Sequence, residues 1–173
     1  GKMEVYVEPF LPQPELMLVG QGRIAELVAE LGRLLHFRVT VNSPGATRED
    51  FPFADQLITD DTDYQKINPG LNSYVIVLTQ HKGDQQVIQA ALSGTPRYIG
   101  LVASAKRSRL VVEYLKEGGM DADALRQVLR APCGLDLGGR TPEEIALSII
   151  TEVVKLRHER TGLSMMEVKQ CSI

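Results

Sequence analysis

The chain has 173 residues, of which 43% are hydrophobic and 24% charged, and its net charge is −3 because 22 acidic residues outnumber 19 basic ones. These values are typical of one globular domain that needs neither a disulfide nor a structural metal to form a core. A slightly acidic chain without a cluster of Lys and Arg is a poor nucleic-acid binder, and it lacks an apolar run of roughly 18 residues that would cross a membrane.

The cysteines and the amino end indicate the cellular compartment. Cys133 and Cys171 are the two cysteines of the chain, and they form neither a CxxC pair nor a metal-ligand spacing. We therefore expect reduced thiols in a cytoplasmic protein, no metal site, and a buried, inert Cys133. Residues 1–3 lack the apolar stretch of a signal peptide, and Gly1 ahead of Met3 resembles a tag remnant.

The sequence divides into three parts. Residues 1–14 are a lead-in segment in which Pro9, Pro12 and Pro14 exclude a central strand. Residues 15–160 form the expected domain. Residues 161–173 form a tail without regular periodicity, which we expect either to dock on a partner or to stay mobile.

Within the domain, short apolar runs alternate with stretches of helical periodicity. Strands are predicted over 16–19, 37–41, 57–58, 74–79 and 98–102, and helices over 24–35, 84–92, 106–116, 122–129 and from 141 onward. The last helix has the clearest start, because Thr141, Pro142 and Glu144 form a capping box with proline at the first helical position.

This alternation predicts an α/β fold: a three-layer, Rossmann-like, doubly wound parallel sheet with helices on both faces. Ligands of such folds bind beyond the carboxyl ends of the strands. The prediction therefore selects four loops, at residues 20–23, 42–48, 79–84 and 103–107.

The first loop has the pattern of a phosphate-binding turn. Gly20 would permit the tight turn, Gly22 would let the backbone approach a pyrophosphate, and Ala25 replaces the third glycine of the fingerprint. The N–H groups of the helix that follows favour an anion, so Gly20, Gln21, Gly22 and Arg23 are candidate phosphate-binding residues. The alternative is a strand-to-helix turn without a ligand.

The second loop departs from an ordinary NAD site. Asn42 and Ser43 stand where an acidic residue is expected, and a neutral side chain binds a ribose hydroxyl less strongly than a carboxylate. Arg48 is a candidate contact for a 2′-phosphate. NADP, another phosphate-bearing cofactor and no dinucleotide all remain open.

The third loop places Thr79 and His81 after a central strand. His81 is a candidate proton carrier, metal ligand or phosphate contact, or else an ordinary surface histidine. A metal is disfavoured because His36 and His158 lie in helical segments with no clustered partner.

The fourth loop places Ser104, Lys106 and Arg107 at a helix start, where cations oppose the helix dipole and suggest an anionic partner. A solvated basic turn is the alternative. No Ser-His-Asp spacing, glycosidase-like carboxylate pair or Walker A loop occurs, so no catalytic residue is assigned.

Four stretches in this order resemble the XdhC/CoxI family, accessory factors of xanthine dehydrogenase and related molybdenum hydroxylases. They are GQGRIA at 20–25, YVIVLTQHKGD at 74–84, YIGLVASAKR at 98–107, and APCGLDLGGRTPEEIALSIITEVV at 131–154, the last being the most specific. The resemblance covers about residues 5–160, the Rossmann domain of that family. It implies a stand-alone or excised version without the family's usual N-terminal domain.

The resemblance implies a role in maturing a molybdoenzyme. Such a protein would bind molybdenum cofactor, as molybdopterin or its dinucleotide, protect it during sulfuration and pass it to the apo-enzyme. The implied partners are a molybdenum hydroxylase apo-enzyme and a cofactor sulfurase, and we expect a homo-oligomer. Asn42, Gln80 and Ala103 replace the acid, the first histidine and the glycine usual in the family, which suggests a divergent ligand preference or a reduced role.

Three hypotheses of function follow. The first is a non-enzymatic cofactor-binding accessory factor. The second is an oxidoreductase that uses NAD or NADP, although no second region large enough to hold a substrate is evident. The third is a regulatory or scaffolding module with a vestigial glycine loop, in which residues 141–173 would form a homodimer surface.

Overall fold

A parallel sheet of six strands forms the centre of the protein. The computed structural model describes residues 1–7, 12–80 and 83–170. The strands are β1 (Glu15–Gly20), β2 (Arg38–Asn42), β3 (Gln56–Ile58), β4 (Ser73–Leu78), β5 (Tyr98–Leu101) and β6 (Leu129–Arg130). Their order is β3-β2-β1-β4-β5-β6 and every neighbouring pair is parallel, which confirms the predicted doubly wound sheet.

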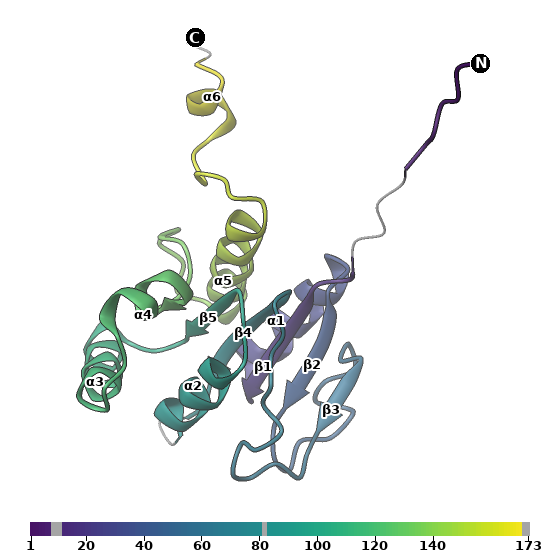
Figure 1. The fold of residues 1–173 in the computed structure, drawn as a ribbon. Coiled ribbons are helices and arrows are strands. Elements are labelled where there is room, and N and C mark those ends of the chain that lie inside the picture. Colours follow the sequence, from purple (N-terminus) through teal and green to yellow (C-terminus); the bar gives the residue numbers. More distant parts are fainter. Residues whose placement is uncertain (8–11, 81–82, 171–173) are drawn as a thin grey trace.

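Helices cover both faces of the sheet (Figure 1). They are α1 (Arg23–Leu34), α2 (Asp84–Ser93), α3 (Ala105–Glu117), α4 (Ala122–Val128), α5 (Pro142–Arg157) and the short α6 (Met165–Val168). Alternate residues of a strand point to opposite faces, and β1 shows this directly. Leu16 and Leu18 pack in the core with α1 and α5, whereas Met17 and Val19 pack in the core with α2, α3 and α4.

The helix α1 lies unusually close to the sheet at Gly32. A Cβ atom built on Gly32 would lie 2.4 Å from Cδ2 of Leu16, and Ala25 of the same helix is fully buried. Small residues at both positions therefore permit the close helix–strand packing that the glycine fingerprint anticipates.

The sequence prediction was wrong about the segment around residue 129. The helix predicted over 122–129 ends at Val128, and Leu129–Arg130 pair with Ile99 and Gly100 as the edge strand β6. A strand of two residues is too short to show a sequence periodicity. It forms by pairing with β5, which is distant in sequence.

The tail contains a helix that the sequence prediction missed. Ser164 caps α6 through a capping box with Glu167, and α6 lies beyond the end of α5, away from the sheet (Figure 1). Leu163, Met165 and Met166 are exposed. Whether this segment forms a homodimer surface remains a prediction.

The capping box predicted for the last helix is confirmed. The Thr141 side chain accepts a hydrogen bond from the Glu144 backbone N–H, and the Glu144 carboxylate accepts one from the Thr141 N–H. The box fixes the start of α5, whose residues Ala146, Ile149 and Val153 are buried against the sheet.

We expect Thr141→Ala to lower the free energy of unfolding by about 1 kcal/mol, because a first-turn N–H group loses its acceptor. Urea denaturation followed by circular dichroism measures this loss. Ser164→Ala removes the same kind of cap from α6, which has no buried residue, and should leave the global unfolding transition unchanged. Equal losses in the two variants would contradict the structural role assigned to the cap of α5.

Candidate functional site

A crevice opens between β1 and β4, where the order of the strands changes direction. The strands β2 and β3 lie on one side of β1, and β4, β5 and β6 lie on the other. The helix after β1 lies on one face and the helix after β4 on the other, so the loops at the carboxyl ends of these strands part. A cavity of about 400 Å³ occupies this position. Its lining residues are Gly20, Gln21, Ser43, Pro44, Tyr64, Thr79 and Gln80.

A second cavity of about 180 Å³ shares Gln21 and Gln80 with the first. It is also lined by Gly22, Glu26, Gly45, Ala46, Asp50 and Phe51. The structure therefore brings together three of the four predicted loops, those that follow β1, β2 and β4.

The two glycines of the first loop have different roles. Gly20 has a φ of +130°, and a Cβ atom there would lie 2.4 Å from the carbonyl oxygen of Leu78, so any side chain would collide with β4. Gly22 has a φ of +103° and open space around it, and no side chain caps α1 at this position. The first-turn N–H groups of α1 are therefore left without a side-chain acceptor at the crevice, as an anion site requires.

Asn42 ends β2 as predicted, but its side chain is buried. It is 1% exposed, and its Nδ2 donates to Oδ2 of Asp61 at 2.5 Å. Asp61 is itself 2% exposed and also accepts from the backbone N–H of Lys66 at 3.1 Å. Among the described residues, the Oδ1 atom of Asn42 has no hydrogen-bond partner, whereas Ser43, the next residue, lines the larger cavity.

Of the two cations predicted at the fourth loop, Arg107 has a partner within the protein. Nε of Arg107 lies 2.7 Å from Oδ2 of Asp84, which is 1% exposed at the start of α2. The Thr79 hydroxyl donates to the other carboxylate oxygen of Asp84. Ser104 caps α3 by accepting from the Arg107 backbone N–H at 3.3 Å, and Lys106 is exposed. Arg107 thus has an anionic partner within the protein, and a ligand contact by Ser104, Lys106 or Arg107 remains a prediction.

The other predicted cations also have partners in the protein. Arg23 is exposed and forms ion pairs with Glu26 at 3.3 Å and with Glu143 at 3.6 Å. Arg48 donates from its guanidinium group to the Ala54 carbonyl oxygen, so its side chain is held against its own loop. The prediction for His81 lies outside the described residues.

Sequence reasoning missed Tyr64. This residue lines the larger cavity and adopts a φ of +60°, which is uncommon for an aromatic residue. A Cβ atom on Gly83 would lie 2.7 Å from the Tyr64 hydroxyl oxygen, so the ring reaches the start of α2. Burial, followed by the carboxylates of Asp84 and Asp61, raises the pKa of Tyr64.

Two features of the sequence explain why Tyr64, Asp61 and Asp84 were missed. Asp61 and Tyr64 lie in the irregular stretch between β3 and β4, which shows no periodicity, and Asp84 has the form of an ordinary first-turn acid. The one available signal was the density of acidic residues at 60, 61 and 63.

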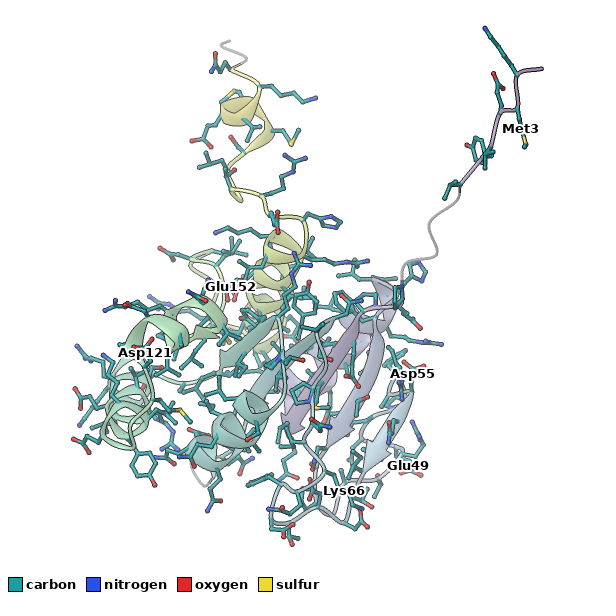
Figure 2. The ribbon with its side chains drawn as sticks, viewed as in Figure 1. Met3, Glu49, Asp55, Lys66, Asp121 and Glu152 are labelled. Carbon is teal, nitrogen blue, oxygen red and sulfur yellow. The ribbon has the colours of Figure 1, made fainter. Side chains whose placement is uncertain are left out.

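The most distinctive motif of the sequence, at residues 131–154, forms a joint between the segment after β6 and α5, held by hydrogen bonds to Glu152. Oε2 of Glu152, labelled on α5 in Figure 2, accepts from the Tyr98 hydroxyl at 2.6 Å and from the Gly134 N–H at 2.9 Å. The backbone N–H of Cys133 donates to the Leu101 carbonyl oxygen. Burial of the thiol and the nearby Glu152 carboxylate raise the pKa of Cys133 to about 12, as expected of an inert thiol, but the residue as a whole is half-buried and not fully buried as predicted.

Among the residues that the structure describes, no group of three His, Cys, Asp or Glu side chains is arranged to hold a metal ion. Over the same residues, no helix combines the length and apolarity needed to cross a membrane.

Comparison with known families identifies the domain. The family model of the XdhC Rossmann domain matches residues 16–153, from β1 to the last buried turn of α5. The chain belongs to this family, which is related to the accessory factors of xanthine dehydrogenase, as the sequence motifs predicted.

Two curated relatives are longer than this chain. Protein YqeB of Escherichia coli strain K12 is 26% identical, over 96% of this chain and 32% of its own length. A probable xanthine dehydrogenase subunit from Bacillus subtilis strain 168 is 30% identical, over 88% of this chain and 46% of its own length. The chain therefore spans about a third to a half of these relatives.

Two solved structures are similar to this one. A crystal structure of a xanthine dehydrogenase from Bacillus halodurans is 26% identical, with a TM-score of 0.73 over 91% of this chain and 46% of that chain. The structure of chuY from E. coli strain CFT073 is 16% identical, with a TM-score of 0.52 over 82% of this chain and 90% of that chain. The second likeness is one of fold alone.

We expect Arg107→Met to destabilise the protein by about 3 kcal/mol, because it leaves the buried Asp84 carboxylate without its cation. Urea denaturation measures the change. Lys106→Met, one residue earlier and exposed, removes the same charge and should change stability little. If the two variants unfold at the same urea concentration, the pair with Asp84 does not stabilise the fold.

We expect the Cys133 thiol to resist modification in the folded protein. Because burial and the Glu152 carboxylate raise its pKa to about 12, little of this thiol is ionised near pH 8, and the thiolate is the reactive form. A Cys171→Ser variant leaves Cys133 as the single thiol, and its reaction with a colorimetric disulfide reagent should be slow until urea is added. Rapid reaction without urea would show that the thiol is accessible and ionised.

Proposed function

Because the chain belongs to the XdhC family, we propose that it is an accessory factor in the maturation of a molybdenum hydroxylase, of the xanthine dehydrogenase or CO dehydrogenase type. In this proposal the domain binds molybdenum cofactor, as molybdopterin or its dinucleotide, and aids its sulfuration or its insertion into the apo-enzyme. The observation that carries it is the open glycine loop at the switch point of the sheet in a chain of this family.

The residues present fit the phosphate part of such a cofactor. Gly22 leaves space at the start of α1, and the N–H groups there have no side-chain acceptor. Backbone N–H groups at a helix start favour an anion without any cationic side chain. When bound, the cofactor would supply the molybdenum chemistry, and this chain would hold its phosphate at Gly20, Gln21, Gly22 and Arg23.

In this proposal the chain holds the cofactor without transforming it, with the apo-enzyme and a cofactor sulfurase as its partners. Three polar side chains at or beside the crevice are held by partners within the protein: Thr79 and Arg107 by Asp84, and Nδ2 of Asn42 by Asp61. Such a framework suits a site that positions a ligand.

A second candidate is an oxidoreductase that uses NAD or NADP. The specific observation in its favour is the strand order 3-2-1-4-5-6 with a glycine loop after the first strand, the arrangement that binds dinucleotides. The absence of an acid directly at the end of β2, where Asn42 stands, counts against ordinary NAD binding.

Titration with molybdopterin dinucleotide by calorimetry tests the proposal. We expect saturable binding, weakened at least about tenfold, or about 1.4 kcal/mol, in Gly22→Val, because the side chain would close the approach to the α1 N–H groups. Gly119→Val is the matched control, since Gly119 also has a positive φ and open space but lies at the end of α3.

No saturable binding, or equal affinity of the Gly22→Val and wild-type proteins, would count against the accessory role. Hydride transfer to or from a bound nicotinamide dinucleotide would favour the oxidoreductase instead.

A further inference from the structure

We infer that two copies of this chain associate by exchanging their tails, each of which packs its apolar residues into a groove beside α4 of the other copy. The exchanged segment is residues 163–168, which include α6. The surface lies away from the crevice, so the association does not depend on which ligand the crevice binds.

A groove of about 340 Å³ runs between α4 and the segment that joins α2 to β5. We call it the α4 groove. Pro96 lies just before β5 and Val128 just before β6, so this groove lies at the amino ends of the strands, whereas the crevice lies at their carboxyl ends. Six of its lining residues have apolar side chains: Leu92, Pro96, Met120, Ala124, Leu125 and Val128.

The α4 groove is open because α4 is short. Its seven residues include one buried side chain, Leu125, so the helix covers this part of the sheet incompletely. The opposite wall is held in place, since the Thr95 N–H donates to the Pro69 carbonyl oxygen at 2.9 Å. A Cβ atom on Gly94 would lie 2.4 Å from the same oxygen, which shows how closely the two segments pack. The groove is therefore a preformed apolar surface, as binding sites commonly are.

The tail exposes four large apolar side chains. Leu163, Met165, Met166 and Val168 are between 51% and 65% exposed, and α6 has no buried residue. A helix of four residues has little stability of its own, so packing against another surface is needed to stabilise it. Leu163 and Val168 flank the Ser164 cap at the two positions where apolar residues commonly pack together. The methionines add flexible side chains that adapt to an irregular apolar surface.

The tail is attached to α5 in a way that keeps it from the α4 groove of its own chain. The Arg160 N–H donates to the Lys155 carbonyl oxygen at 3.0 Å, and a Cβ atom on Gly162 would lie 3.3 Å from Cδ of Lys155. Only Leu163 separates Gly162 from Ser164, the cap of α6, so there is no linker to carry α6 around the sheet. The helix α5 packs on one face of the sheet and α4 on the other. Figure 1 shows α6 beyond the end of α5, away from the sheet.

A second copy supplies the surface that the tail lacks in its own chain. Glu159, just after α5, lies 3.2 Å from Arg97, just before β5, so the tail leaves the domain at the same edge of the sheet as the α4 groove. Two copies related by a two-fold axis at this edge can each place a tail in the groove of the other, and such an exchange closes as a dimer. Every contact then occurs twice, which favours the roughly 1,200 Å² or more of buried surface that a stable association needs.

The charges of the two surfaces are complementary. Asp121, labelled in Figure 2, is the charged residue that lines the α4 groove. Arg160, at the base of the tail, is exposed and forms no ion pair with any residue that the structure describes. A tail that enters the groove brings a cation toward this acid, which favours the exchange over a random apolar contact.

Sedimentation velocity over a range of concentrations tests the exchange. We expect the wild-type chain to form a dimer, and Leu163→Asp in the tail and Ala124→Arg in the groove each to raise its dissociation constant at least about tenfold. Leu110→Asp is the matched control, because Leu110 on α3 is 58% exposed and Leu163 is 57% exposed, and this variant should dimerise as the wild type does. Circular dichroism checks that each variant is folded.

A cross-linking experiment identifies the two surfaces that meet. Chains with Met165→Cys and chains with Ala124→Cys, both in a Cys171→Ser background, are mixed and oxidised. We expect a disulfide-linked dimer with one chain of each kind, identified by mass spectrometry. Leu110→Cys in place of Ala124→Cys should give no such product.

A wild-type chain that stays monomeric, or a dimer that survives both Leu163→Asp and Ala124→Arg, would overturn the inference. Dissociation by Leu163→Asp without a cross-link to Ala124→Cys would place the tail on another surface and would overturn it as well. So would an intramolecular disulfide in a single chain that carries both Met165→Cys and Ala124→Cys, because the tail would then occupy its own groove.

Discussion

The contact between Gly20 and the carbonyl of Leu78 is the constraint on which the binding crevice depends. A Cβ atom at Gly20 would lie 2.4 Å from that oxygen, so only glycine lets β1 end against β4 and turn away from it. The turn sends α1 to one face of the sheet while β4 sends α2 to the other. Because the two loops then part, the larger cavity forms at their junction, and Gly22 at the start of α1 lines the smaller cavity beside it.

Charge is distributed around this crevice in a consistent way. Arg107, Arg23 and Lys66 each pair with an acidic side chain of the chain itself. If the crevice binds an anion as proposed, this pairing reduces the attraction of the three cations for it, and the backbone N–H groups of α1 would contribute to its affinity. Affinity from backbone groups depends on shape more than on ionic strength, because these groups carry only partial charges and sit close to the ligand. Such a site would suit the release of the cofactor that the proposed function requires.

Much of the fold could be predicted from the sequence, for reasons that particular residues make clear. The β1 run ends at a glycine, α1 repeats apolar residues every three or four positions, and Thr141 with Glu144 marks the start of α5. These signals are local. The pairing of β6 with β5, the hydrogen bond from Asn42 to Asp61 and the ion pair from Arg107 to Asp84 join segments distant in sequence. No local pattern encodes such contacts, so the loops of the site could be predicted but not the partners of their side chains.

The joint formed by Cys133, Tyr98 and Glu152 has a consequence for sulfur chemistry. Carrying sulfur as a persulfide requires a thiol that ionises near neutral pH and meets its donor at the surface. Cys133 has a pKa of about 12 and sits beside a carboxylate that already accepts two hydrogen bonds. The thiol thus serves to pack the distinctive motif against α5. Cys133 is not among the residues that line the two cavities of the crevice, so within the proposed function we expect the sulfur of a maturing cofactor to come from another thiol.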